Sequence, residues 1–316
     1  MFEKFFSLAE NPFSMSPDPR FLMATELHRE AIAGLIYGVT ERKGFLVLTG
    51  EAGTGKTTVL RAVADALPES VQFSYVLNPA LSPNELLEHT LLDLGIEDVP
   101  ESKARRLFQL GEFLAERHRG GVVSALVVDE AHKLTPELLE EIRLLTNFET
   151  NTEKLLQIVL VGQPELGAML NRADLRQLKQ RIALRFKVTA LRPEEVPHYV
   201  RHRWSKAGAT SDPPFSAEAL ETIKQHSQGI PRLINAICEN ALLAAFAAGN
   251  RLVEANHVET VALNLDLADE QDAVAEPELG PLPDAEAGDS ALPDLDRVPG
   301  KKVDGKGWLT RLSIAR

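Results

Sequence analysis

The stretch that most limits how this chain can fold is GEAGTGKT, residues 50–57, which fits the pattern G-x-x-x-x-G-K-[ST]. A continuous apolar run at residues 45–49 comes directly before it, and apolar side chains at helical spacing follow over residues 58–67. A glycine-rich loop between a buried strand and a helix points backbone N–H groups and the positive helix end at an anion. The sequence therefore predicts a strand–loop–helix unit that holds phosphate groups.

Within this loop the glycines permit a tight turn, and the polar residues after them can act on a nucleotide. Lys56 is expected to reach the β- and γ-phosphates of ATP, and the Thr57 hydroxyl is expected to bind Mg²⁺. We expect ATP and Mg²⁺ as cofactors. The predicted nucleotide-binding residues of the loop are Gly50, Glu51, Ala52, Gly53, Thr54, Gly55, Lys56, Thr57 and Thr58.

A second motif, SALVVDE at residues 124–130, is an apolar strand that ends in two carboxylates. The carboxyl ends of strands in an open α/β sheet form the edge where ligands bind. Asp129 is predicted to hold Mg²⁺, and Glu130 is predicted to orient and activate the attacking water. The alternative is a solvated acidic pair. With His132 the motif reads DEAH, but the residues after it show no second motor domain, so His132 is expected only to begin a loop near the site.

The bulk composition excludes several classes of protein. The 316 residues carry a net charge of −12, which does not favour a general nucleic-acid binder. The one cysteine, Cys238, forms no disulfide within the chain and indicates a reducing compartment. The longest apolar run, residues 241–248, is too short to span a membrane, and the N-terminus lacks a secretory segment. We therefore expect a cytoplasmic protein.

Strand and helix patterns alternate in the first part of the chain, which predicts a mostly parallel α/β sheet covered on both faces. Helix starts are marked by a capping box at Ser82–Glu85 and by Thr135-Pro136. Strands are expected at residues 45–49, 71–77, 122–128, 155–161 and 186–191, and later helices at 194–207, 217–227, 231–248 and 255–265. The predicted domains are a nucleotide-binding core at 1–192, a helical lid at 193–265, and a disordered acidic linker with a basic C-terminal peptide at 266–316.

Other polar residues are candidates for the same site. Gln163 follows the strand predicted at 155–161 and could position the water or contact the γ-phosphate. Arg232 lies in the first turn of a helix, where its charge is unfavourable unless an anion such as nucleotide phosphate binds nearby. A predicted helical stretch carries further candidates that could complete a neighbouring subunit's site or could be solvated: Arg172, Arg176, Arg181 and Arg185.

Taken together, these motifs resemble an AAA+ ATPase, and more narrowly the ExeA/GspA secretion-ATPase group, over residues 1–265. The narrower resemblance rests on NPFS at 11–14, PDPRFL at 17–22, HREA at 28–31, DEAH at 129–132, VLVGQPEL at 159–166 and GIPR at 229–232. It implies a five-stranded P-loop core with a helical lid, and a ring or other homo-oligomer with ATP between subunits. It also implies that Gln163 is sensor 1, Arg232 is sensor 2, Arg181 is the arginine finger, and Pro12 and Phe13 lie near the adenine.

The resemblance implies an ATPase, hydrolysing ATP to ADP and phosphate, that serves a bacterial envelope apparatus for secretion, pilus assembly or exopolysaccharide export. The secretion prototype continues into a transmembrane helix and a peptidoglycan-binding domain that this sequence lacks, so we expect a protein partner to provide any contact with the inner membrane.

Two alternatives stay open. One is an ATP-dependent DNA-binding transposition helper, for which a basic row of pore residues is needed; the candidates are Lys103, Arg105, Arg106, Arg117 and Arg119. The other is a nucleotide-gated scaffold that recruits a partner through the C-terminal peptide, where Trp308 and Leu312 could line one side of a short helix.

Overall fold

The computed structural model describes residues 1–77 and 79–267. Residues Met1–Leu267 form one compact unit. The predicted disorder of the acidic linker and the predicted docking role of the C-terminal peptide fall on residues 268–316, which lie outside the described residues.

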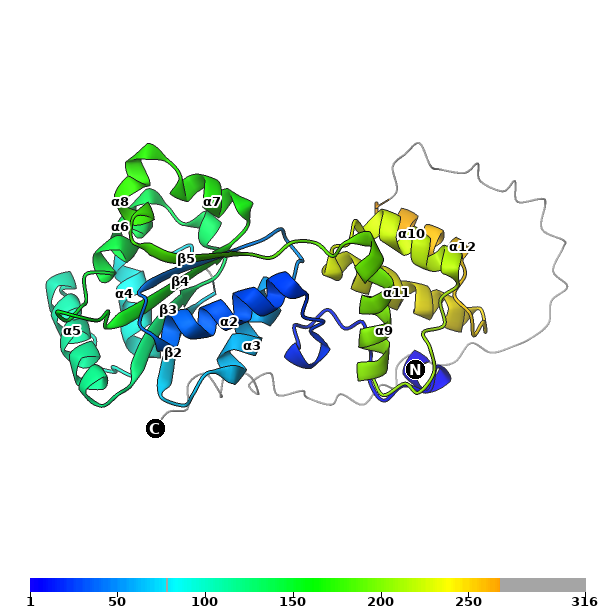
Figure 1. Cartoon of the computed structure of the whole chain (residues 1–316), viewed down its shortest axis with the longest axis horizontal. Helices are drawn as coiled ribbons and strands as arrows, with labels where there is room; N and C mark the ends of the chain where they lie inside the picture. Colours follow the sequence, from blue (N-terminus) through cyan, green and yellow to red (C-terminus); the bar gives the residue numbers. More distant parts are fainter. Residues whose placement is uncertain (78, 268–316) are drawn as a thin grey trace, which may run out of the picture. The chain divides into compact units, whose positions relative to one another are not determined.

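Five parallel strands form a single sheet in the order β2-β3-β4-β1-β5 (Figure 1). This arrangement confirms the predicted α/β fold with a five-stranded parallel sheet, and four of the predicted strands agree with the structure to within one residue. The strands are β1 (Phe45–Thr49), β2 (Val71–Val76), β3 (Val123–Val128), β4 (Leu156–Gly162) and β5 (Ile182–Lys187).

The predicted position of the fifth strand, residues 186–191, was wrong. β5 begins at Ile182 and ends at Lys187, and its residues alternate between half-buried and exposed. β5 is an edge strand that pairs only with β1, and its successive side chains point to opposite faces of the sheet. Leu184 and Phe186 pack against the cluster formed with α2, while Arg185 is exposed on the other face, so β5 lacks the continuous apolar run of the interior strands. The predicted helical stretch through Arg185 is accordingly replaced by the short helix α8 (Arg176–Lys179), a turn and this strand.

Helices cover both faces of the sheet, and alternate strand residues point to each face. α2 (Glu26–Thr40) and α3 (Lys56–Ala66) pack on one face against Leu46, Leu48, Val127 and Val159. The other face, with Phe45, Val47, Leu126 and Ile158, packs against α4 (Pro83–Asp93), α5 (Lys103–Arg119), α6 (Pro136–Leu145) and α7 (Pro164–Leu170). The capping box predicted at Ser82 and Glu85 is present, and Thr135 caps α6.

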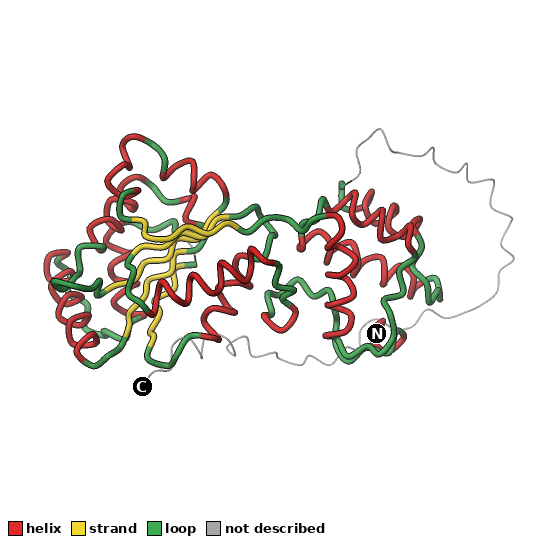
Figure 2. Tube along the Cα trace, in the orientation of Figure 1, coloured by secondary structure: helices red, strands yellow, loops and turns green. Residues whose placement is uncertain are grey.

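After β5 the described chain contains only helices and loops (Figure 2). The main helices are α9 (Val196–Lys206), α10 (Ala217–Ser227), α11 (Pro231–Ala247) and α12 (Ala255–Asn264). Their shared core contains Trp204 and Cys238. The N-terminal residues around α1 (Phe2–Phe5) join this same cluster, with Phe6 edge-on to Trp204. The helical unit is therefore built from both ends of the described chain, whereas the predicted boundaries at 192/193 and 265/266 stay predictions.

Candidate functional site

The glycine-rich loop connects β1 to α3 at the carboxyl edge of the sheet. Gly53 and Gly55 have φ angles of +80° and +97°, which glycine adopts without steric cost, and α3 begins at Lys56. The Lys56 Nζ donates to the carbonyl oxygens of Gly50 and Glu51, at 2.8 and 2.9 Å. Burial lowers the pKa of Lys56, while nearby carboxylates, first Glu130, partly oppose that shift. The ammonium group is thus held inside the turn of the loop.

Asp129 directly follows β3 and lies beside the start of α3, and its two carboxylate oxygens have different partners. Oδ1 accepts the backbone N–H of Glu130 at 2.8 Å. Oδ2 accepts the hydroxyl of Thr57 at 3.4 Å and the hydroxyl of Tyr75, on β2, at 3.2 Å. Burial raises the pKa of Tyr75, so its hydroxyl stays protonated and remains a donor. The two predicted Mg²⁺ ligands, Thr57 and Asp129, are therefore brought together, and Tyr75 is a contact that the sequence did not reveal.

Glu130 adopts a left-handed backbone conformation, with φ of +51°, directly after the strand. Such a conformation is uncommon for a residue with a side chain and costs free energy, so the surrounding contacts must impose it. Its carboxylate Oε2 lies 3.3 Å from the Lys133 Nζ and 3.5 Å from the His132 Nε2. The predicted water-activating residue is thus held by two groups of its own loop.

Gln163 directly follows β4 and precedes α7, next to this loop. Its backbone N–H donates to the His132 Nδ1 at 3.3 Å, and its side-chain amide lies 3.3 Å from the His132 Nε2. The structure therefore brings Gln163 to Glu130 through a histidine that the sequence analysis treated only as the start of a loop. The DEAH pattern at residues 129–132 is the sequence signal that could have indicated a role for His132.

A cavity of about 580 Å³ opens over the glycine-rich loop. This volume lies in the range of small-molecule sites. Loop residues 52–58 line one side of it, with Glu130, Lys133, Gln163 and Arg232, and residues 14–18 and 21–23 of the N-terminal segment line the other. Among the predicted loop residues, Gly50 and Glu51 lie behind the wall, where their carbonyls hold Lys56.

Pro12 and Phe13 do not line this cavity. Phe13 is fully buried and packs edge-on against Phe215, and the Pro12 carbonyl accepts a hydrogen bond from the buried Arg203 guanidinium. The residues directly after them, from Ser14 onward, form the wall. The predicted N-terminal segment therefore lies at the cavity, and Pro12 and Phe13 hold it in place through their contacts with Arg203 and Phe215.

The two arginines predicted from the resemblance lie in different surroundings. Arg232 is exposed and lines the cavity, and its backbone N–H donates to the Gly53 carbonyl oxygen at 3.2 Å. Arg181 precedes β5 outside the cavity, and its guanidinium donates to the Asn147 Oδ1 at 2.7 Å and to the Thr146 hydroxyl. The structure does not bring Arg181 to the site of its own chain.

His28 is a further cavity residue that the sequence analysis did not assign. It lies on α2 and is 3% exposed. Its Nε2 lies 3.3 Å from the Thr54 carbonyl oxygen and its Nδ1 lies 2.7 Å from the Thr25 hydroxyl. Burial lowers the pKa of His28, although the contact with Thr54 and the charge of Glu195 act in the other direction. His28 therefore supports the glycine-rich loop from behind as a neutral group.

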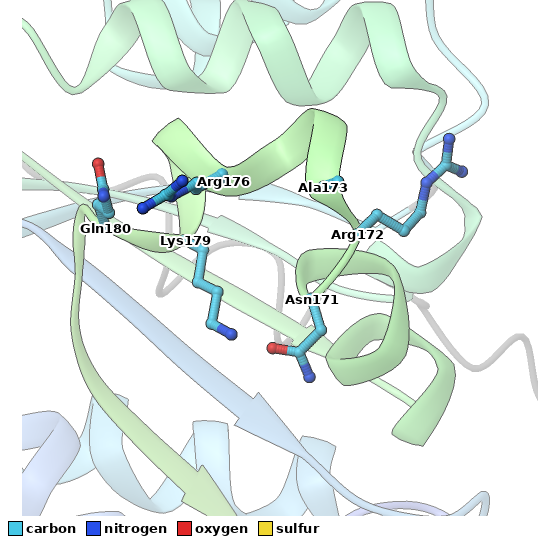
Figure 3. Close-up of a pocket in the computed structure, with 6 residues that line it drawn as sticks. All are labelled: Asn171, Arg172, Ala173, Arg176, Lys179 and Gln180. Carbon is cyan, nitrogen blue, oxygen red and sulfur yellow. The ribbon is translucent and has the colours of Figure 1, made fainter.

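A second, more open cavity of about 500 Å³ lies around the turn between α7 and α8 (Figure 3). Asn171 and Lys179 extend from the same side of this turn, while Arg172 points away from them and binds Asp174 at 2.8 Å. None of the loop residues or carboxylates described above lines this cavity. It is therefore separate from the candidate site.

The basic residues considered for DNA binding are mostly engaged within the chain. Lys103 pairs with the buried Glu141 at 2.5 Å, and Arg106 is buried and pairs with Glu88 at 2.9 Å. Arg117 donates to the side-chain oxygen of Gln72. These three residues therefore do not form a free basic row on α5.

The parallel sheet, the loop between β1 and α3, and the acidic end of β3 are typical of the P-loop fold of AAA-type proteins. Residues 39–170 match the AAA domain family. The chain is related to general secretion pathway protein A, and the predicted resemblance to the ExeA/GspA group is confirmed. General secretion pathway protein A of Aeromonas hydrophila is 45% identical over 254 residues, which are 80% of this chain and 46% of that protein. The chain thus spans about half the length of this relative.

Two further similarities are more distant. ATP-dependent target DNA activator B of Escherichia phage D108 is 27% identical over 258 residues, covering 80% of this chain and 74% of that protein. The solved structure of the Aeropyrum pernix ORC2 protein superimposes with a TM-score of 0.62 at 16% identity, covering 84% of this chain and 75% of that one. The similarity to the ORC2 protein supports the fold alone.

Two features are absent from the described residues, 1–77 and 79–267. No helix in these ranges is both long and apolar enough to cross a bilayer. No group of three or more His, Cys, Asp or Glu side chains in them could hold a metal ion.

Proposed function

We propose that this chain is a Mg²⁺-dependent ATPase that couples ATP binding and hydrolysis to the assembly or operation of a bacterial envelope apparatus. The observation that carries the proposal is the pair formed by Thr57 and Asp129 at 3.4 Å, beside the Lys56 ammonium and on the edge of the cavity. Mg²⁺ in such sites takes only one or two protein oxygens and completes its shell with phosphate and water. The donors present therefore fit Mg²⁺ bound together with a nucleotide.

In this mechanism each residue of the chain has a separate task. Bound Mg²⁺ would draw charge from the β- and γ-phosphate oxygens, and Thr57 and Asp129 would hold it. Lys56 would leave the loop carbonyls and donate to the phosphates, which its position in the loop permits. Glu130 would accept the proton of the attacking water, Gln163 would contact the γ-phosphate, and Arg232 would stabilise phosphate charge from α11. Arg181 would act on a neighbouring subunit's site.

The envelope role rests on the relative from the general secretion pathway, which matches this chain at 45% identity. We propose a homo-oligomer that acts through a protein partner, in the cytoplasm or at the inner membrane surface. A DNA-dependent assembly is the second candidate, favoured by the similarity to the phage target DNA activator. The engaged state of Lys103, Arg106 and Arg117 weighs against α5 as its DNA-binding surface.

The test is to measure phosphate release and oligomer mass for the wild type and for Glu130→Gln, with Glu97→Gln as a control on an exposed loop. Each protein is assayed with and without duplex DNA at two salt concentrations. We expect wild-type turnover that requires Mg²⁺, loss of turnover in Glu130→Gln, and ATP-dependent assembly of that variant without DNA. Assembly only on DNA, with steep loss at high salt, would favour the second candidate. Wild-type protein that binds no ATP would refute both.

A further inference from the structure

We propose that His132 is a positioning residue that joins Glu130 to Gln163, so that the water-activating group and the γ-phosphate contact adjust together. This inference rests on the proposed ATPase function and adds to it a residue of this chain. It assigns a role to the histidine of the DEAH motif that the function described above leaves unused.

The ring of His132 is held tightly between two strand ends. It belongs to the short turn η2 (Ala131–Lys133) after β3, and its side chain is 12% exposed, whereas that of Glu130 is 38% exposed. A Cβ added at Gly162, the last residue of β4, would lie 3.1 Å from the His132 backbone nitrogen. The glycine at the end of β4 therefore lets the turn approach closely, which places the ring beside both Glu130 and Gln163.

The hydrogen bonds determine which ring nitrogen carries the proton. The backbone N–H of Gln163 can only donate, and it points at the His132 Nδ1 across 3.3 Å. The tautomer that accepts this bond keeps the lone pair on Nδ1 and carries its hydrogen on Nε2. This assignment makes Nε2–H the single donor that His132 offers to the site.

That one donor has two possible acceptors. Nε2 lies 3.5 Å from the Glu130 Oε2 and 3.3 Å from the Gln163 amide nitrogen. The nitrogen and oxygen of that amide exchange places on half a turn, which puts the accepting oxygen towards the ring. Because a single N–H serves one strong acceptor at a time, rotation of Glu130 towards the water frees the donor for Gln163. Binding of the Gln163 amide to a γ-phosphate likewise returns the donor to Glu130. The two residues are thus linked through the ring.

Two amide substitutions can separate the two sides of the ring. In His132→Asn the amide oxygen can take the place of Nδ1 and accept the Gln163 N–H, but nothing replaces the Nε2 donor. In His132→Gln the longer side chain can carry a donor to the Nε2 position. We expect His132→Asn to lower kcat about tenfold, with the KM for ATP within about twofold of wild type, as for other residues that orient a ligand-contacting group. His132→Gln should recover most of that loss, and His198→Asn, on the exposed face of α9, should match wild type.

A double substitution tests the link itself. Adding His132→Asn to Gln163→Ala should lower kcat no further than Gln163→Ala alone, because coupled residues are not additive. In full-length protein labelled with ¹⁵N-histidine, the His132 ring should show a protonated Nε2 and an unprotonated Nδ1. Its signals are identified by their loss in His132→Asn.

The outcomes distinguish this inference from the proposed function. Wild-type turnover that His132→Asn leaves unchanged, multiplicative effects in the double variant, or a ring protonated on Nδ1 would each overturn the inference and leave the ATPase intact. A wild type that binds ATP without hydrolysing it would remove the proposed function and this inference together. Support requires the kcat loss, the recovery in His132→Gln and the Nε2–H ring.

Discussion

The backbone N–H of Arg232 donates a hydrogen bond to the carbonyl oxygen of Gly53 across 3.2 Å. Arg232 lies in the first turn of α11, where backbone N–H groups have no acceptor within the helix. The glycine-rich loop supplies that acceptor, so this loop and the helical segment are joined directly through the backbone. A movement of the loop on phosphate binding would therefore reach α11 without any side chain in between.

We predict that Gly53→Ala weakens both the fold and nucleotide binding. Gly53 has φ of +80°, and an added Cβ would meet the Arg232 Cβ at 2.8 Å and the Ile230 Cγ2 at 2.9 Å. The backbone conformation alone costs a non-glycine residue about 1–2 kcal/mol. Urea denaturation and titration with a fluorescent ATP analogue measure the two effects. Gly167→Ala in α7, where an added Cβ meets nothing within 4 Å, is the control and should leave the unfolding free energy and the affinity for the ATP analogue unchanged.

Tyr75→Phe should raise the Mg²⁺ concentration needed for half-maximal ATP turnover. The substitution removes one of the two hydroxyl donors that orient the Asp129 Oδ2. A neutral hydrogen bond contributes about 1 kcal/mol, so we expect roughly a fivefold rise. The exposed Tyr37 provides the control Tyr37→Phe. An unchanged Mg²⁺ dependence in Tyr75→Phe would show that Asp129 needs no orientation by β2.

Arg203→Lys should destabilise the protein by about 2 kcal/mol, because hydrogen bonds from a charged donor are strong and lysine cannot reproduce the guanidinium fork. The Arg203 side chain is buried and donates to the carbonyls of Pro12 and Ser14 and to the hydroxyl of Tyr199. The free energy of unfolding should be compared with that of Arg201→Lys, an exposed change on the same helix. Equal values for the two variants would mean that Arg203 does not anchor the N-terminal segment.

Acid should destabilise the protein partly through His28. Its pKa is lowered in the folded state by burial, so the unfolded chain binds the proton more readily. The contribution to stability is therefore present above the ordinary histidine pKa, near 6.5, and is lost as the pH falls towards the lower folded pKa. We expect His28→Gln to reduce the difference in unfolding free energy between pH 7.5 and pH 5.5. His198→Gln, on an exposed position, should leave this difference as in wild type.

Arg181→Ala should abolish turnover only if Arg181 acts on a neighbouring subunit. Arg181 lies outside the cavity of its own chain, on contacts with Asn147 and Thr146. Mixing inactive Arg181→Ala with inactive Glu130→Gln should then restore part of the activity, because some interfaces combine an intact arginine with an intact glutamate. Mixtures that stay inactive argue against action in trans. The exposed Arg201 on α9, which is not among the candidate arginines, provides the control Arg201→Ala.

Much of the fold followed from local sequence. The loop at 50–57 determined where β1 ends and α3 begins, because its glycines and its lysine allow few other backbone paths. The interior strands were placed to within one residue because strands buried on both faces must be continuously apolar. The caps at Ser82 and Thr135 identified helix starts because they satisfy backbone donors next to them in the chain.

The remaining features depend on contacts between residues that are distant in the chain, which a local pattern does not contain. β5 was misplaced because its residues alternate between half-buried and exposed, and the inward position of Leu184 and Phe186 depends on packing with the cluster of α2. The N-terminal segment packs with α9–α12, and Phe13 is buried behind the cavity wall, because the tertiary fold brings the two ends of the described chain together. His132 reaches Gln163 because β3 and β4 are neighbours in the sheet. The sequence by itself thus determined the glycine-rich loop and the residue types on which the predicted phosphate site rests, and the tertiary structure decided which side chains surround them.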